Sequence, residues 1–150
     1  MTRAVLDRAA LAALVPHAGA MCLLDGVLAW DEWEVRCHSR SHLAADNPLR
    51  GAHGLAAIHA VEYAAQAMAV HGALLGAGAA ARSLPGYLAA LNDVALGVAR
   101  LDDVEATLEV MARRLVIMGR SMLYAFEVSA GGRLLARGRA SVAAPAGEAA

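Results

Sequence analysis

The spacing of apolar and polar residues changes along the chain, and each change predicts a new structural element. Apolar residues at helical spacing predict a short N-terminal helix over residues 3–14, within the first 15 residues. The next two segments, 21–29 and 34–42, have the apolar runs and the alternation of β-strands. Because only 30–33 separate these strands, we expect them to form an antiparallel hairpin.

The longest helical segment is 55–75, which lies between a loop over 44–54 and a flexible connection over 76–85. It is apolar on almost every face, which is typical of a buried helix. Its length would allow a membrane span, but Glu62 and Gln66 lie inside it and predicted strands surround it. We therefore expect a buried central helix and no membrane span.

The last third of the chain has the alternation of strands, and Gly131 and Gly132 form a strong turn signal between the last two. The order of helix, two strands, long helix and four strands predicts an α+β fold, in which one antiparallel β-sheet wraps around one central helix. We expect a single domain over 1–150, with a frayed tail over 145–150. The four strands are expected at 86–98, 104–117, 121–129 and 133–143.

Composition adds expectations about assembly and location. Hydrophobic residues make up 59% of the 150 residues and charged residues 18%, which excludes a disordered or fibrous chain. So apolar a chain predicts a subunit interface. A net charge of −1 gives no reason to expect nucleic acid. The cysteines form no CxxC pair and the charged N-terminus is unlike a signal peptide, so we expect a reduced, cytoplasmic protein.

The polar residues of the central helix are the first candidates for chemistry. His59, Glu62 and Gln66 are spaced three and four residues apart, which puts them in one narrow stripe. An ionised carboxylate is costly to bury, so Glu62 must be paired, neutralised or placed at a cavity. It is therefore either a structural or exposed glutamate, or a general acid at the end of an apolar pocket. His71 lies on the opposite face and is expected to serve packing or an interface.

The loop that leads into this helix, Gly51-Ala52-His53-Gly54, is the second candidate. A histidine between glycines can approach a substrate closely, and unpaired N–H groups at a helix start can polarise a carbonyl oxygen. An exposed loop histidine without a role is the alternative. Across an apolar cavity, His53 and Glu62 could remove a proton α to a thioester and deliver one to a β-hydroxyl.

Other motifs are weak or absent. The sequence has no HExxH, Walker A, GxGxxG or GxSxG pattern, so zincin, P-loop, Rossmann and α/β-hydrolase chemistry have no support. His38, Arg40 and His42 alternate on one strand face, where a solvated edge is expected rather than a metal site. The arginines of the closing hairpin and of 113–120 form either a solvated face or a docking surface for an acidic carrier protein.

Three segments together resemble the hot-dog-fold 3-hydroxyacyl-ACP dehydratases, the FabZ-like family. Residues 15–17 and 21–27, VPH and MCLLDGV, are similar to the family's PHxxxMLLLDxV opening. Residues 61–67, VEYAAQA, match the ExxAQ pattern of its central helix, and 47–50 and 86–103 follow its neighbouring regions. The longer run VEYAAQAMAVHGAL is most similar to the dehydratase-like subgroup of aryl-polyene and related fatty-acid-like clusters.

The resemblance implies a hot-dog dimer, either a homodimer or a heterodimer with another hot-dog subunit. It implies a 3-hydroxyacyl substrate on the phosphopantetheine arm of an acyl carrier protein, with no other cofactor and no metal. Glu62 matches the family's catalytic glutamate through its ExxAQ context. His53 is the nearest match to the family's histidine, and His59 is the competing base.

We therefore predict dehydration to a trans-2-enoyl thioester, with His53 as the base at Cα and Glu62 as the acid at the departing hydroxyl. The backbone N–H of Gly54 or Leu55 would bind the thioester oxygen, and Gln66 would position Glu62. Two alternatives remain open. One is a hot-dog thioesterase that hydrolyses the same bond, and the other is a non-catalytic acyl-binding or partner subunit of a hot-dog heteromer.

Overall fold

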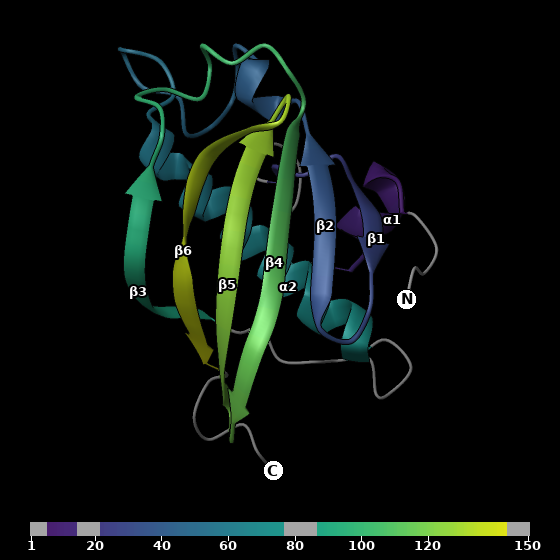
Figure 1. Cartoon of the computed structure of the whole chain (residues 1–150). Helices are drawn as coiled ribbons and strands as arrows, with labels where there is room; N and C mark the ends of the chain where they lie inside the picture. Colours follow the sequence, from purple (N-terminus) through teal and green to yellow (C-terminus); the bar gives the residue numbers. More distant parts are fainter. Residues whose placement is uncertain (1–5, 15–21, 77–86, 144–150) are drawn as a thin grey trace.

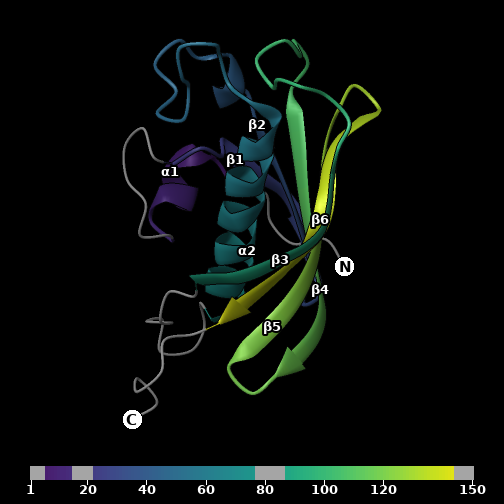
Figure 2. The ribbon, with the colours of Figure 1, turned by 90° about the vertical axis from the view of Figure 1, so that its left-hand side faces the viewer.

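A curved antiparallel sheet packed on one long helix forms the described part of the chain (Figure 1). The computed structural model describes residues 6–14, 22–76 and 87–143. Helix α2 (Ala60–Gly76) lies against one face of the sheet, which curves around it (Figure 2). This arrangement confirms the predicted α+β fold. The strands lie in the spatial order β1 (Gly26–Trp30), β2 (Glu34–Ser39), β4 (Leu108–Met118), β5 (Ser121–Ala130), β6 (Arg133–Ala143) and β3 (Tyr87–Leu96), and neighbours are antiparallel.

Alternate side chains of the central strands build the core against α2. Val110 pairs with Val128, and Ala112 pairs with Phe126, across the ladder between β4 and β5. These four residues are buried, as is Ala136 on the neighbouring β6. In this part of the strands every second residue is apolar in the sequence, and these are the residues whose side chains are buried against α2. The bounds of β6 agree with the predicted strand over 133–143.

Helix α2 is buried over most of its surface, as its apolar sequence predicts. Tyr63, Ala64, Ala67 and Val70 have no exposed surface. Glu62, in the first turn, is the exception and is exposed. No helix in the described ranges is long and apolar enough to cross a membrane.

Helix α2 begins later than predicted, after a 3₁₀ turn, η3 (Ala57–His59). The residues before η3 pair instead with the segment that follows β3. The N–H of Ala57 donates to the carbonyl of Ala99 at 3.0 Å, and the N–H of Leu101 donates to the carbonyl of Leu55 at 2.8 Å. Backbone groups used in this pairing are not available to a helix.

The first strand also begins later than predicted, at Gly26 rather than at 21. The N–H of Leu23 donates to Oε1 of Gln66 at 2.8 Å, and its carbonyl accepts the hydroxyls of Ser39 at 2.5 Å and Ser41 at 2.7 Å. Side chains thus satisfy the backbone where a ladder was predicted.

The N-terminal helix is shorter than predicted, since α1 spans only Arg8–Ala12. Asp7 caps it by accepting the N–H of Ala10 at 2.9 Å. Strand β4 begins at Leu108 rather than at 104. The predicted residues 3–5 of the helix, the connection from 77 onwards and the tail over 145–150 lie outside the described ranges.

The two edges of the sheet differ. Leu6 covers the edge of β1, because its N–H donates to the carbonyl of Val27 at 3.2 Å and its carbonyl accepts the N–H of Val27 at 2.9 Å. Within the described ranges no segment pairs with the outer edge of β3. This edge strand also carries exposed apolar side chains: Leu88, Leu91 and Leu96 are 38%, 40% and 44% exposed. A long, uncovered apolar edge is typical of a surface that pairs with another chain.

His71 is a structural residue, as predicted. It is fully buried between Tyr124 and the β1–β2 turn. Its Nε2 lies 2.8 Å from the carbonyl of Asp31, which can only accept, so Nε2–H donates there and Nδ1 accepts the Tyr124 hydroxyl at 2.7 Å. Burial lowers the pKa of His71 below its ordinary value of 6.5. The folded chain therefore holds this imidazole neutral.

We expect His71→Leu to lower the free energy of unfolding by about 2–4 kcal/mol, because it leaves the buried Tyr124 hydroxyl without a partner. Urea unfolding near neutral pH measures this loss, and adding Tyr124→Phe should recover part of it. The stability that depends on neutral His71 is present above pH 6.5, the ordinary value, and is lost as the pH falls. A pH dependence of unfolding that is the same in His71→Leu as in the unsubstituted protein would contradict this account.

Candidate active site

Glu62 lies in the first turn of α2, and its carboxylate is exposed to solvent. No hydrogen bond or ion pair to a described residue holds it. A negative charge in the first turn is favoured by the helix dipole. Within one chain the expectation of a carboxyl at the closed end of an apolar pocket is therefore not met, because solvent reaches the group.

His53 stands on a tight turn between two glycines. The N–H of Gly51 donates to the carbonyl of Gly54 at 2.9 Å, and the N–H of Gly54 donates back to Gly51 at 3.2 Å. Gly54 has a φ of +95°, and a Cβ there would come within 2.6 Å of Arg100. The turn therefore requires glycine at 54. His53 is exposed, and no hydrogen bond joins it to Glu62 in the described part of the chain.

The two N–H groups predicted to bind the thioester oxygen already have acceptors. The N–H of Gly54 donates to Gly51, and the N–H of Leu55 donates to Oδ1 of Asp102 at 3.1 Å. A donor that is satisfied inside the fold is not available to a ligand in the same conformation. In this conformation neither N–H is free for a thioester oxygen, so the oxyanion site at Gly54 and Leu55 stays a prediction that the hydrogen bonding does not support.

The predicted stripe of His59, Glu62 and Gln66 spans three environments. Glu62 is exposed, His59 is half-buried at the end of η3, and Gln66 is only 7% exposed. Oε1 of Gln66 accepts the N–H of Leu23, so this atom fixes the entry to β1. The positioning of Glu62 by Gln66 is not supported by this contact. Within the described part of the chain neither His53 nor His59 forms a hydrogen bond with Glu62.

Asp102 organises the base of the His53 turn, which the sequence pattern did not predict. Its carboxylate accepts two bonds from Arg100, at 2.7 and 3.1 Å, and one from Arg50 at 3.2 Å, besides the N–H of Leu55. The side chain of Asp102 is only 5% exposed. The Arg100 guanidinium holds the pKa of Asp102 far below its usual range. The available signal was that Arg50 and Asp102 lie in two of the segments that resemble the dehydratase family.

A buried hydroxyl network fastens the loop after β2 to helix α2. The Tyr63 hydroxyl lies 2.8 Å from Oγ of Ser41 and accepts a bond from Nδ2 of Asn47 at 3.1 Å. Nδ2 of Asn47 also donates to the carbonyl of Ser41 at 2.8 Å. Tyr63 directly follows Glu62, so this network fixes the helix turn that carries the candidate acid.

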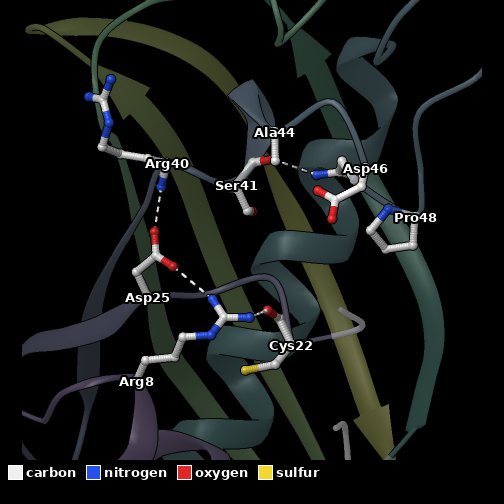
Figure 3. Close-up of a pocket in the computed structure, with 9 residues that line it drawn as sticks. Arg8, Cys22, Asp25, Arg40, Ser41, Ala44, Asp46 and Pro48 are labelled. Carbon is white, nitrogen blue, oxygen red and sulfur yellow. Dashed lines mark hydrogen bonds and ion pairs between the residues drawn. The ribbon is translucent and has the colours of Figure 1, made fainter. Parts of the chain in front are cut away.

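A surface pocket of about 320 Å³ lies between α1 and this loop (Figure 3). Arg8 spans its floor, bonded to the Asp25 carboxylate and the Cys22 carbonyl, both at 2.8 Å. The backbone N–H of Arg40 donates to the other Asp25 oxygen at 2.7 Å. Through these bonds Arg8 and Asp25 hold α1 against the residues that precede β1 and the residue that follows β2. Glu62, His53 and His59 do not line it.

Metal binding has no candidate cluster here. Among the described residues, no three His, Cys, Asp or Glu side chains lie together as metal ligands would. His42 was predicted on a solvated edge of the second strand, but it lies in a 3₁₀ turn after β2 and is fully buried, so this prediction is wrong for His42. Its Nε2 lies 2.8 Å from the carbonyl of Val104. The ring therefore packs inside the fold, and burial lowers its pKa.

The antiparallel sheet wrapped around one central helix is the hot-dog fold. A family model then gives the assignment within that class: the ApeP-like family, described as ApeP dehydratase, matches residues 9–150. The chain belongs to this family of hot-dog dehydratases. No curated protein sequence matches the chain at a significant level.

Solved structures share the fold. The ApeI:P dehydratase heterocomplex from Xenorhabdus doucetiae matches with a TM-score of 0.80 and 22% identity, over 90% of each chain. A mutant of the phenylacetic acid degradation protein PaaI from Thermus thermophilus matches with a TM-score of 0.57 and 20% identity, over 79% of this chain and 91% of that one. A hypothetical thioesterase with coenzyme A from Streptococcus pneumoniae matches with a TM-score of 0.53 and 11% identity, over 79% and 84%. At these identities the similarity concerns the fold.

Proposed function

We propose that the chain is one subunit of a cytoplasmic hot-dog dehydratase, which converts a 3-hydroxyacyl thioester on acyl carrier protein into a trans-2-enoyl thioester. Membership of the ApeP-like family supports the reaction class. Glu62, in the ExxAQ context of α2, is the general acid, and His53 is the general base. The acyl chain is carried on phosphopantetheine, and the reaction uses no other cofactor.

The chemistry is a β-elimination of water. His53 takes the proton from Cα, the Cα–Cβ double bond forms, and the Cβ–O bond breaks. Glu62 donates its proton to the leaving hydroxyl, which departs as water, and the proton held by His53 returns to Glu62 through solvent. Because the Gly54 and Leu55 amides are engaged inside the fold, the donor to the thioester oxygen comes from elsewhere in the assembled site.

The exposure of Glu62 supports the proposal that a second subunit completes the site. A general acid works best where water is excluded, and α2 begins beside the segment that follows the uncovered edge strand β3. A hot-dog partner that pairs along β3 would cover this end of the helix. The ApeI:P structure, whose fold is similar, is a dehydratase heterocomplex, which supports the presence of a second subunit.

Product analysis tests the function. The protein is purified under conditions that retain any bound subunit and is given 3-hydroxyacyl carrier protein. Enoyl thioester should appear, and His53→Ala should lower its rate by about 10²-fold or more, while His59→Ala should not. The reverse ranking would make His59 the base.

Two outcomes of this assay would overturn the proposal. Free thiol without an enoyl intermediate would make the protein a thioesterase, and turnover equal to that of the unsubstituted protein in both His53→Ala and Glu62→Ala would remove the assigned groups from the reaction. If the chain purified with a bound subunit still turns over substrate in both variants, the chain is a non-catalytic subunit. That is the second candidate function. The occupied Gly54 and Leu55 amides favour that candidate over a thioesterase that uses them.

A further inference from the structure

The register between the uncovered edge strand β3 and β6 shifts twice, once between Leu88 and Ala90 and once around Asp93. The register between β3 and β6 passes from Asn92 opposite Arg139 to Ala95 opposite Arg137. Residues 93 and 94 therefore face Gly138 alone, which is a β-bulge. Asp93 has a φ of +56°, and it is the one residue other than glycine with a positive φ in the described part of the chain.

The two residues of the bulge have different roles. Val94 turns toward the core over Gly138, where its Cγ2 lies 3.1 Å from the position that a Cβ on Gly138 would occupy. Asp93 is the extra residue and is exposed on the edge. Its carboxylate has no ion pair with any described residue. At this bulge the strand thus presents a local bend, and a negative charge without an ion pair in the described chain, to whatever pairs with it.

Pairing with an identical chain would bring two such charges together. A dimer with twofold symmetry places β3 antiparallel to its own copy, so a residue near the middle of the strand approaches the same residue of the copy. Strand β3 spans Tyr87–Leu96, and Asp93 lies within two residues of its midpoint. Two carboxylates at one partly desolvated interface repel each other, and two bulges disturb the same stretch of ladder.

We propose that Asp93 makes this edge select a different hot-dog subunit, one with a basic residue opposite the bulge, over a second copy of the same chain. This inference rests on the proposed assembly through β3, but not on the proposed reaction. A basic side chain opposite Asp93 would neutralise the charge that a second copy doubles. The apolar residues of β3 supply contact area to either partner, so the carboxylate decides between them.

Self-association of the purified chain tests the inference without any substrate. Sedimentation equilibrium of the isolated chain should give weak dimerisation, and Asp93→Asn should strengthen it by at least about tenfold. Asparagine removes the charge and still tolerates a positive φ, so the bulge is retained. Glu127→Gln is the matched control, because it removes an exposed carboxylate from β5, away from the edge, and should leave the dimer constant within about twofold. Salt near 1 M should strengthen the unsubstituted dimer, because it screens the repulsion.

A charge-swapped copy tests the complementary half. Asp93→Lys alone should dimerise weakly, whereas an equal mixture with the unsubstituted chain should form mixed dimers at least about tenfold more tightly than either alone, as measured by native mass spectrometry with one copy tagged. Tight dimerisation of the unsubstituted chain, an unchanged constant in Asp93→Asn, an equal gain in Glu127→Gln or an absence of mixed dimers would each overturn the inference. The dehydratase assay can fail while these results hold, and the reverse is also possible, so the two proposals are separable.

Discussion

Replacing Glu62 by Gln is expected to lower kcat for water loss by about 10²–10⁴-fold, because glutamine has the shape of glutamate but no proton to give to the leaving hydroxyl. KM should change little, since the substitution preserves the size of the side chain. The rate of enoyl thioester formation on carrier-bound substrate, at saturating and limiting concentrations, measures both constants.

The exposure of Glu62 makes this experiment easy to interpret. The carboxylate has no partner among the described residues, so Glu62→Gln should leave the free energy of unfolding within about 0.5 kcal/mol. Glu32→Gln is a matched control, because Glu32 is also exposed but lies in the β1–β2 turn. It should retain full activity. A Glu62→Gln protein with normal turnover would exclude the carboxyl from proton transfer.

The second large effect is expected at Asp102. Replacing it by Asn should lower the free energy of unfolding by about 2–3 kcal/mol, because the new amide places a donor against the guanidinium groups of Arg50 and Arg100. The expected loss is smaller than for a fully buried ion pair, because 45% of the Arg100 side chain is exposed. For a chain of this length the loss corresponds to a fall in Tm of roughly 4–12 °C. Differential scanning calorimetry measures it directly.

Asp103→Asn provides the control for that result. Asp103 is the next acidic residue and lies 3.7 Å from the same Arg100, but 65% of its side chain is exposed. Its loss should cost less than about 0.5 kcal/mol. The difference between Asp102→Asn and the unsubstituted protein should narrow as the pH falls below 3.8, the ordinary pKa, because the stabilisation belongs to the ionised carboxylate. A difference that stays constant down to acid unfolding would contradict the ion-pair explanation.

The sequence predicted the sheet better than the ends of its elements. Alternation of apolar residues is a property of each strand by itself, so the strand over 133–143 could be read without knowledge of its neighbours. The starts of β1 and α2 depend on remote partners. The N–H and the carbonyl of Leu23 are bonded to the side chains of Gln66 and Ser39. The carbonyl of Leu55 is bonded to the segment that follows β3. Contacts between residues far apart in sequence leave no local pattern, so these boundaries were misplaced.

The candidate site was predicted in part for the same reason. Glu62 was identifiable because a carboxylate in an apolar helix is conspicuous in the sequence itself. The engagement of the Leu55 N–H was not, because its acceptor, Asp102, lies far along the chain. The sequence also left open whether Glu62 is exposed, because an apolar helix indicates burial on average, whereas the solvent contact of one side chain depends on what packs beside its first turn.

The bulge in β3 has a consequence for comparing related chains. Val94 packs over Gly138, where a Cβ would lie 3.1 Å from Cγ2 of Val94 and 2.8 Å from the ring of Phe126, so a side chain at 138 would displace both residues. Through evolution, positions 93 and 138 should therefore change together. Homologues with alanine or a larger residue at position 138 should have a regular strand at position 93. Aspartate, asparagine or glycine is then not required at position 93.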